Sequence, residues 1–411
     1  MHLTRLSLTH FRNFTRLDVE LPRRVLLLIG ANAQGKTNFL EAIYFLATFS
    51  SFQTHVERQL VHFLEARKSP AVTRLIGEYQ RRDGKHRLEI RLILESSGTN
   101  GQRLRKEALL DGVKKPLSQI VGHFNAVLFA PQMTQIIEGG PEERRRFLNL
   151  ALAQVIPSYA ATLSEYVHLL EQRNALLKDL QDRKGDPSQL DVWDQELAKR
   201  GAHLMYWRIQ ALQEIERLAA RVHLELTRQD EVLRLVYRPA YEPLPMPVGQ
   251  MSLPVQISLD RSHLQVEQIQ DGFAEHLRRT RQEEIARGMT LIGPHRDEVR
   301  FLINGIDLGD YGSRGQVRTA LLSLKLAEME WMRMRNGEWP VLLLDEVLSE
   351  LDAQRREDLL RHLSTYDQAI LSATDASDFP STFLSQATVW EVKMGSIYES
   401  ACGAPEGREM D

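Results

Sequence analysis

The chain begins with two segments in which apolar and polar residues alternate, the pattern of strands with one buried face. The apolar positions are Leu3, Leu6 and Leu8 in the first segment and Leu17, Val19 and Leu21 in the second. Residues 25–29 are apolar throughout, as in a strand buried on both faces, and residues 38–49 have helical spacing. Residues 70–130 predict a meander of strands, the last at 125–130, with a hairpin turn at Asp111-Gly112.

Residues 142–230 are richer in charged residues, leucine and alanine. Two stretches of helical periodicity, 159–184 and 190–228, are separated by a turn signal at 184–187. At about 1.5 Å per residue they predict an antiparallel pair of helices, each about 40–55 Å long. A proline-rich connection follows at 238–255. The remaining pattern predicts a helix at 263–287, strands at 290–303, a long helix at 315–335, a strand at 341–344, a helix, and a strand at 369–371.

The loop between the apolar strand and the first helix matches the phosphate-binding pattern G-x-x-x-x-G-K-[ST] in full. It runs Gly30, Ala31, Asn32, Ala33, Gln34, Gly35, Lys36, Thr37. Its glycines let backbone N–H groups surround phosphate oxygens at a helix N-terminus, which favours anions. We therefore predict that the loop binds ATP, that Lys36 reaches the β- and γ-phosphates as a catalytic group, and that the Thr37 hydroxyl binds Mg²⁺.

A second apolar strand, at 341–344, ends in the two acids Asp345 and Glu346. Such a buried strand is expected to deliver Asp345 to the Mg²⁺ shell. Glu346 is then placed to orient or deprotonate the attacking water. About 300 residues separate these acids from the phosphate-binding loop, so a large insertion divides the predicted ATPase.

Residues 311–319 open the long helix that precedes the acidic strand. Ser313, Gly315 and Gln316 match the L-S-G-G-Q signature of ABC ATPases, while Gly312 and Arg314 depart from it. A serine hydroxyl and free N–H groups at a helix start form a second phosphate site, which in this class serves the ATP of a partner chain. The alternative role of Ser313 is a plain helix N-cap.

Three further segments hold candidates for the same site. The segment Ser349 to Asp352 resembles the D-loop S-x-L-D, so Asp352 is expected near the nucleotide. Gln132 sits where the Q-loop belongs and is predicted to contact Mg²⁺ or the water; a surface-loop glutamine is the alternative. ABC transporters usually have a switch histidine after the 369–371 strand, where this chain has Thr374 and Asp375; either could contact the γ-phosphate instead.

The order of these motifs resembles the RecF family of the ABC/SMC-type ATPases. Four segments carry the resemblance: the opening Leu6–Phe14, the phosphate-binding loop through Asn38, the Gly140–Leu148 segment, and Gly293–Glu298 ahead of the signature. The resemblance spans about residues 3–375. It implies an α/β ATPase head with an inserted arm of antiparallel helices, divided as 1–141 and 288–395 for the head, 142–287 for the arm and 396–411 for a flexible tail.

The resemblance also implies partners and a process. These are ATP-dependent homodimerisation on DNA, either duplex or single-strand/duplex junctions, and recombinational repair of gaps at stalled forks. RecO- and RecR-type proteins would help to load the recombinase. The departures from the family pattern are Gln132, Val317 and the segment 48–55, at positions that concern γ-phosphate sensing and DNA contact. The alternatives are an SMC-like break-repair ATPase, whose arms would be far longer, and a transporter ATPase subunit, which would lack the long helices.

Charge distribution adds one point to this picture. Residues 1–150 carry 23 Lys and Arg against 14 Asp and Glu, whereas the rest of the chain carries 29 against 41. A basic N-terminal part permits a surface for an anionic partner, although scattered solvated charge is the alternative. The basic candidates for DNA are Arg103, Arg105, Lys106, Lys114 and Lys115, with Arg144–Arg146 as a cluster that could equally pack on acids. With a single cysteine, Cys402, no long apolar run and no signal-peptide pattern, we expect a cytoplasmic protein without membrane contact.

Overall fold

The computed structural model describes residues 1–68, 70–97, 101–244, 259–350, 353–363 and 365–399. Its contacts divide the chain into two compact units. We call Met1–Gln132 with Met332–Asp411 the sheet unit, and Met133–Trp331 the helical unit. These limits differ from the domain boundaries at 141/142 and 287/288 expected from the sequence, and the division into functional domains stays a prediction. None of the helices in the described ranges is long and apolar enough to span a membrane.

The first sheet of the sheet unit is antiparallel, with the strand order β2-β1-β4-β5-β6-β7. Its strands are β1 (His2–Phe11), β2 (Phe14–Glu20), β4 (Ala71–Arg81), β5 (Gly84–Ser97), β6 (Gly101–Leu110) and β7 (Val113–Lys115). The alternation in the sequence is confirmed, because Leu3, Leu6 and Leu8 are fully buried on one face of β1. The hairpin turn is also confirmed: Asp111 and Gly112 both have positive φ, 51° and 81°, between β6 and β7.

The second sheet has the order β15-β14-β3-β13-β12-β8. Its strands are β3 (Arg24–Ile29), β8 (Ala126–Phe129), β12 (Val341–Asp345), β13 (Gln368–Ala373), β14 (Thr388–Lys393) and β15 (Ser396–Glu399). All neighbours except β14 and β15 are parallel, so their carboxyl ends meet at one edge, where ligands of such sheets bind.

The assignment of residues 125–130 to the antiparallel meander was wrong. They form β8, which pairs in parallel with β12 in the second sheet. The physical reason is visible in burial. All four residues of β8 are buried, as in a parallel sheet, whereas the meander strands alternate between buried and exposed positions.

Helix α1 (Lys36–Thr48) contacts strands of both sheets. A helix covered on opposite sides has no face toward solvent. Its side chains must therefore be apolar on all sides, or polar with a hydrogen-bond or ion-pair partner. From Phe39 to Thr48 every residue is buried. The sheet unit also contains the short helices α2 (Leu117–Ile120), α10 (Ala353–Leu363) and α11 (Ser381–Leu384).

The predicted flexible tail was wrong for Ser396–Glu399, which form β15 against β14. Met394 and Gly395, with φ of 49° and 76°, make the two-residue turn that joins the two strands. The sequence lacks the Asn-Gly or Asp-Gly pair that usually signals such a turn, so the hairpin was missed. Residues 400–411 lie outside the described ranges.

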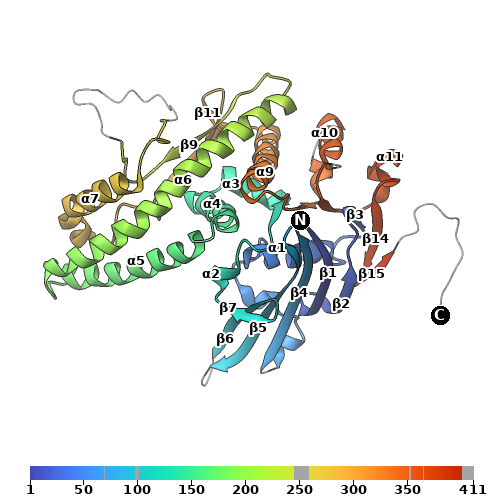
Figure 1. Cartoon of the computed structure of the whole chain (residues 1–411), viewed down its shortest axis with the longest axis horizontal. Helices are drawn as coiled ribbons and strands as arrows, with labels where there is room; N and C mark the ends of the chain where they lie inside the picture. The colour runs from blue at the N-terminus through green and yellow to red at the C-terminus, as the bar shows by residue number, and fades with distance from the viewer. Residues whose placement is uncertain (69, 98–100, 245–258, 351–352, 364, 400–411) are drawn as a thin grey trace, which may run out of the picture. The chain divides into compact units, whose positions relative to one another are not determined.

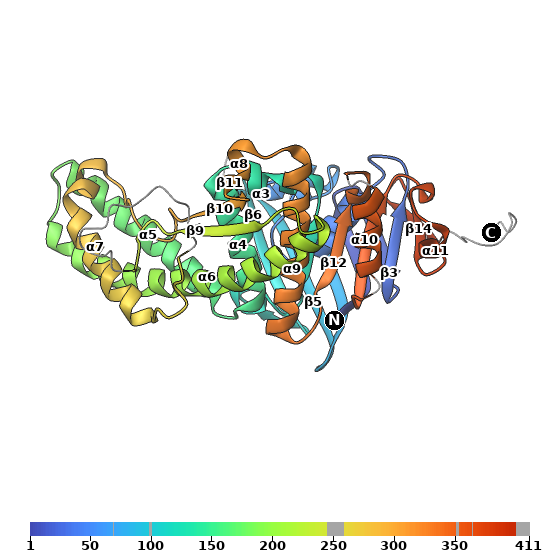
Figure 2. The same cartoon turned by 90° about the horizontal axis from the view of Figure 1, so that it is seen from above.

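The helical unit is built on α4 (Pro141–Val155), α5 (Tyr159–Gln181), α6 (Leu190–Leu226) and α7 (Val266–Arg287). The two long helices predicted from the sequence are α5 and α6, and α7 packs against both (Figures 1 and 2). A small antiparallel sheet follows the order β11-β10-β9, with β9 (Leu233–Arg238), β10 (Glu298–Ile303) and β11 (Ile306–Asp307). The remaining helices are α3 (Gln135–Glu138), α8 (Leu308–Tyr311) and most of α9 (Arg314–Asn336).

Ion pairs and a hydrogen bond join the parts of the helical unit. Arg208 of α6 donates from Nη1 to Asp297 Oδ2 at 2.7 Å, and the Tyr237 hydroxyl of β9 donates to the same oxygen at 2.5 Å. Arg144 of α4 makes two bonds to Glu298, at 2.6 and 2.9 Å. The segment 293–298 therefore ties α4, α6 and β9 together. Removing one partner of a buried pair such as Arg208–Asp297 typically costs about 3–5 kcal/mol.

Candidate functional site

The loop from Gly30 to Gly35 links β3 to α1 and has backbone conformations that other residues would not allow. Gly30 and Gly35 have φ of 147° and 121°. A Cβ atom on Gly30 would lie 2.5 Å from the Val392 carbonyl oxygen, and one on Gly35 would lie 2.6 Å from Asn13 Nδ2. Both positions therefore need glycine, and the loop N–H groups stay available at the start of α1.

Lys36 is buried inside this loop. Its side chain is 3% exposed, and its ammonium donates to the carbonyl oxygens of Gly30 at 2.7 Å and Ala31 at 3.1 Å. Glu346 Oε1 lies 3.5 Å from the same nitrogen. A positive charge at this point is suited to hold the phosphates of a nucleotide, as the loop sequence predicts.

Asp345 ends β12 and meets two hydroxyl groups. Thr37 Oγ1 donates to Asp345 Oδ1 at 3.0 Å, and Ser372 Oγ of β13 donates to the same oxygen at 2.7 Å. Burial raises the pKa of Asp345, and the hydrogen bonds from Ser372 and Thr37 act against that rise. A hydroxyl and a carboxylate converging beside a phosphate-binding loop fit Mg²⁺, which takes one or two protein oxygens together with phosphates and water.

Glu346 has a left-handed backbone, with φ of 51°, a conformation that costs free energy in a residue with a side chain. Its N–H donates to Ser372 Oγ at 3.0 Å, which stabilises this conformation. The side chain is 38% exposed and lies beside Lys36. Glu346 thus borders the loop while remaining open to water.

Gln132 and the residues after β13 lie at the same sheet edge. Gln132 follows β8 by three residues, and β8 pairs with β12 so that Phe129 is opposite Leu344. Gln132 and Thr374 are exposed, and Asp375 accepts from the Ser377 N–H at 2.7 Å, as an N-cap. The roles of Gln132, Thr374 and Asp375 toward the nucleotide stay predictions.

Several contacts around the loop were not foreseen. Asn13 Nδ2 donates to the Gln34 carbonyl at 3.0 Å, and Asn38 donates to Asn13 Oδ1 at 2.8 Å. From the C-terminal hairpin, the N–H groups of Met394 and Gly395 donate to Gln34 Oε1 at 2.8 Å and to its carbonyl at 3.0 Å. Gln34 is therefore held on two sides. The sequence signal for Asn13 was its place in the opening segment; for the hairpin there was none.

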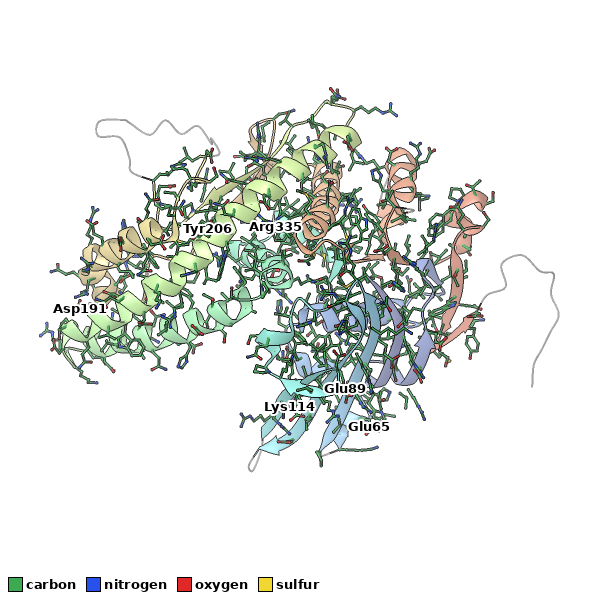
Figure 3. The ribbon with its side chains drawn as sticks, viewed as in Figure 1. Glu65, Glu89, Lys114, Asp191, Tyr206 and Arg335 are labelled. Carbon is green, nitrogen blue, oxygen red and sulfur yellow. The ribbon has the colours of Figure 1, made fainter. Side chains whose placement is uncertain are left out.

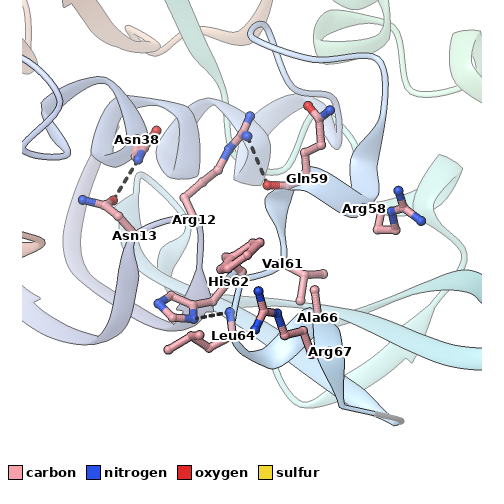
Figure 4. A pocket seen from close by; sticks show the side chains of 11 residues that line it. Arg12, Asn13, Asn38, Arg58, Gln59, Val61, His62, Leu64, Ala66 and Arg67 are labelled. Carbon is pink, nitrogen blue, oxygen red and sulfur yellow. Dashed lines mark hydrogen bonds between the residues drawn. The ribbon is translucent and has the colours of Figure 1, made fainter.

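A hollow of about 850 Å³ adjoins the loop supports Asn13 and Asn38 (Figure 4). Its other lining residues are Arg12, Arg58, Gln59, Val61, His62, Phe63, Leu64, Ala66 and Arg67. The Arg67 guanidinium lies 4.4 Å from the centre of the Phe63 ring, and Phe63 is 66% exposed. Arg12 anchors one wall through two 2.7 Å bonds to the buried Glu41. An exposed aromatic ring and guanidinium groups suit a planar or anionic ligand.

The signature residues lie in the helical unit, at the start of α9. Ser313 Oγ accepts from the Gln316 N–H at 3.2 Å, and Gln316 Oε1 accepts from the Ser313 N–H at 3.1 Å. This reciprocal pair is a capping box, so Ser313 does serve as an N-cap. Ser313, Arg314 and Gly315 are exposed, and the nearest atom to a Cβ on Gly315 would be Ser313 Oγ at 4.0 Å. The helix start is therefore accessible to a further anion.

Asp352, the predicted D-loop residue, lies outside the described residues. The DNA candidates in the sheet unit are mostly paired with acids. Arg105 binds Glu107, Lys106 binds Glu57 at 2.5 Å, and Lys114 binds Glu107 at 2.6 Å. Figure 3 shows Lys114 on β7 of the antiparallel sheet. In the described part of the chain Arg103 and Lys115 have no ion pair, so they are the better candidates.

The cluster Arg144–Arg146 is largely structural. Arg144 binds Glu298, as described above, and also donates to the Gly139 carbonyl at 2.7 Å. Arg145 donates to the Asp297 carbonyl at 2.8 Å. The second interpretation in the sequence analysis, packing on acids, is therefore confirmed for Arg144.

Comparison with known proteins agrees with this geometry. Residues 2–387 match the family model described as the RecF/RecN/SMC N terminal domain. The chain is 40% identical over 410 residues to the DNA replication and repair protein RecF of Roseiflexus castenholzii, over 97% of this chain and 100% of that protein. The chain belongs to the RecF family. It is thus a member of a family of DNA replication and repair proteins, and the resemblance seen in the sequence is confirmed.

Solved structures support the same assignment. The recombination mediator protein RecF with ATP in the RecFOR pathway matches this RecF-family chain with a TM-score of 0.81 at 28% identity, over 97% of this chain and 98% of that one. An SMC head bound to the C-winged helix domain of ScpA matches with a TM-score of 0.51 at 14% identity, over 98% of each chain. The second likeness concerns the fold alone. The predicted fold class, an α/β ABC/SMC-type ATPase head with a helical insertion, is confirmed.

Proposed function

We propose that this RecF-family protein binds and hydrolyses ATP with Mg²⁺, and that ATP drives its homodimerisation on DNA during recombinational repair. One observation carries the proposal. The Lys36 ammonium lies inside the loop 30–35, and beside it the Thr37 hydroxyl is 3.0 Å from the Asp345 carboxylate. A phosphate-binding loop next to oxygen ligands for a hard cation is the arrangement that MgATP requires. The solved RecF structure with ATP supports the choice of nucleotide.

Each part of the nucleotide has residues suited to it. The N–H groups of the loop and Lys36 would hold the phosphates, and Thr37 and Asp345 would hold Mg²⁺, with Gln132 as a further candidate from the edge of β8. When bound, the cation neutralises charge that develops on the β- and γ-phosphates. We assign the nucleoside part to the hollow lined by Asn13, Asn38 and Phe63, because it adjoins the loop.

Hydrolysis requires a group that orients or deprotonates water, and we assign this role to Glu346. Its carboxylate borders the loop, beside Lys36, and is partly exposed. A carboxylate buried away from water could not do this. Asp345 is buried and accepts hydrogen bonds from two hydroxyl groups, so we assign it to the cation and not to the water.

Dimerisation follows from the signature. The exposed start of α9, with Ser313, Gly315 and Gln316, would bind the phosphates of ATP held by a second copy, and Asp352 is assigned to the same interface. Two copies related by a two-fold axis would then form two composite sites. DNA and RecO- and RecR-type proteins are the proposed partners, since the solved relative is described as a recombination mediator of the RecFOR pathway. The proposed location is the cytoplasm.

The nucleotide assignment is tested with Lys36→Met. Removing the charge from the loop should weaken ATP binding by about tenfold or more, because hydrogen bonds to charged groups are worth about 1.5–3 kcal/mol. Equilibrium binding of a fluorescent ATP analogue measures the effect. Lys85→Met, which changes an exposed lysine of the same unit, is the matched control. Unchanged affinity in the Lys36 variant would refute the assignment of the loop.

The DNA assignment is tested by salt titration. Affinity for duplex DNA should fall steeply with salt, because each phosphate contact releases counterions. It should also be higher with ATP than with ADP, because only the ATP-bound dimer joins two basic surfaces. Replacing Arg103 and Lys115 together by Ala should reduce the slope of log affinity against log salt by about 2. Arg105→Ala is the control, since Arg105 is bound to Glu107. Salt-independent binding would count against DNA as the partner of this surface.

A further inference from the structure

The signature glutamine is held by an acidic residue 85 positions away in the sequence. We propose that this residue, Glu231, positions the signature for the ATP of the partner chain and couples it to the long helix α6. The inference rests on the proposed function, in which the signature of one chain completes the site of another. It adds a positioning residue, in the segment between α6 and β9, that no motif in the sequence marks.

Both ends of the Gln316 side chain are engaged. Its Oε1 accepts from the Ser313 N–H at 3.1 Å, and its Nε2 donates to Glu231 Oε1 at 2.8 Å. Turning the amide over would place oxygen against a carboxylate and an amino group against an N–H, so only one orientation satisfies both partners. Ser313 Oγ in turn accepts from the Gln316 N–H. By holding the Gln316 side chain, Glu231 therefore also helps to position Ser313.

Glu231 is itself held in place by the backbone around it. The next residue, Val232, exchanges two hydrogen bonds with Asn304, at 2.9 and 3.1 Å. Before it, Arg228 and Gln229 both have left-handed backbones, with φ of 53° and 70°. Two consecutive residues of this kind without glycine cost free energy. The chain adopts them at the turn that brings Glu231 from the end of α6 to the start of α9.

His223 of α6 links Glu231 to the helix. Its Nε2 lies 3.2 Å from Glu231 Oε2, and its Nδ1 lies 3.0 Å from Ser323 Oγ of α9. The Ser323 hydroxyl also lies 2.7 Å from the Thr319 carbonyl oxygen. His223 is fully buried, so its two ring nitrogens meet protein groups only, a carboxylate on one side and a hydroxyl on the other.

These bonds form one path from α6 through His223 and Glu231 to Gln316. A hydrogen bond to a charged group constrains direction as well as distance. A shift of α6 relative to α9 would therefore alter the orientation of the Gln316 amide, and with it the capping box of Ser313. The arm helix and the signature are coupled through a polar contact, in addition to the apolar packing around them.

The first test is steady-state ATPase activity of the full chain with Glu231→Ala. Since ATP binds to the sheet unit and Glu231 acts on the signature, KM should stay within about twofold, while kcat falls by about tenfold to a hundredfold. Asp230→Ala removes the same charge from the neighbouring residue, whose side chain does not touch the signature, and should leave both parameters unchanged. A normal kcat for Glu231→Ala, or an equal loss for Asp230→Ala, overturns the proposal.

The second test separates a positioning role from a general loss of stability. In a two-fold dimer, Glu231→Ala mixed with Lys36→Met gives one composite site without either lesion, so activity should return in part. Glu231→Ala mixed with Ser313→Arg gives no intact site, so activity should stay low. Recovery in the second mixture, or failure in the first, overturns the positioning role. If Glu231→Ala does not fold, as judged by ATP binding and thermal melting, Glu231→Gln is used with the same partners.

The mixture of Ser313→Arg with Lys36→Met is measured alongside. If that reference mixture recovers no activity, the shared site is wrong and the positioning role is wrong with it. If the reference recovers and the Glu231 mixtures do not follow the expected pattern, the shared site stands and only the role of Glu231 is refuted.

Discussion

Replacing Glu346 by Gln should lower ATP turnover by about a hundredfold or more and leave ATP bound. The amide keeps the size of the side chain but cannot take a proton, and loss of a general base typically costs 10²–10⁴-fold. Binding should not weaken, because Glu346 Oε1 lies 3.5 Å from Lys36 Nζ. Removing its charge leaves the ammonium freer to hold phosphate. The variant should therefore accumulate as an ATP-bound dimer.

Single-turnover hydrolysis and gel filtration with ATP measure the two parts of this prediction. Glu391→Gln provides the control, since it removes the same charge from β14 at the same sheet edge, where Glu391 is paired with Lys393 at 2.7 Å. Normal hydrolysis by the Glu346 variant would show that another group prepares the water. A loss of ATP binding would show instead that Glu346 belongs to the nucleotide pocket.

The elements with the clearest periodicity could be predicted from the sequence. β1, β2, β3, α1, α5, α6 and α9 all lie where alternation or helical spacing places them. The errors fall where local pattern does not determine the partner. The apolar sequence of β8 fits a strand of either sheet. Only its pairing with β12, more than 200 residues later in the chain, assigns it to the second sheet. β9 pairs with β10 some 60 residues later, and the sequence carries no sign of that pairing.

The site shows the same division. Residues that touch the ligand through a local motif could be predicted, because a phosphate-binding loop needs its glycines, Lys36 and Thr37 close together in the chain. Residues that support the motif come from distant segments. Ser372 reaches Asp345 only because β12 and β13 are neighbours with those residues in register. Asn13 and Gly395 reach Gln34 only because the tertiary fold brings their loops together.

Mixing two inactive variants should restore part of the ATPase activity. Lys36→Met disables the loop of its own chain, and Ser313→Arg places bulk and charge where the phosphates of the partner's ATP should bind. Each homodimer then has two damaged sites. In the mixed dimer one site carries both lesions and the other carries neither. Since the mixed dimer has one intact site of two, we expect at most about half of wild-type activity per chain.

Ser313→Arg alone makes the prediction specific. The capping box at Ser313 gives the serine a structural role, and its loss would cost about 0.5–2 kcal/mol of stability. A purely structural role predicts a lower melting temperature with normal ATP-driven dimerisation. A role at the partner's phosphates predicts normal ATP binding by the monomer and no dimer. Ser313→Ala, which loses the cap without adding charge, separates the two effects: it should share the change in stability and retain more dimerisation. No recovery on mixing, together with ATP-driven dimerisation of Ser313→Arg, would refute the shared site.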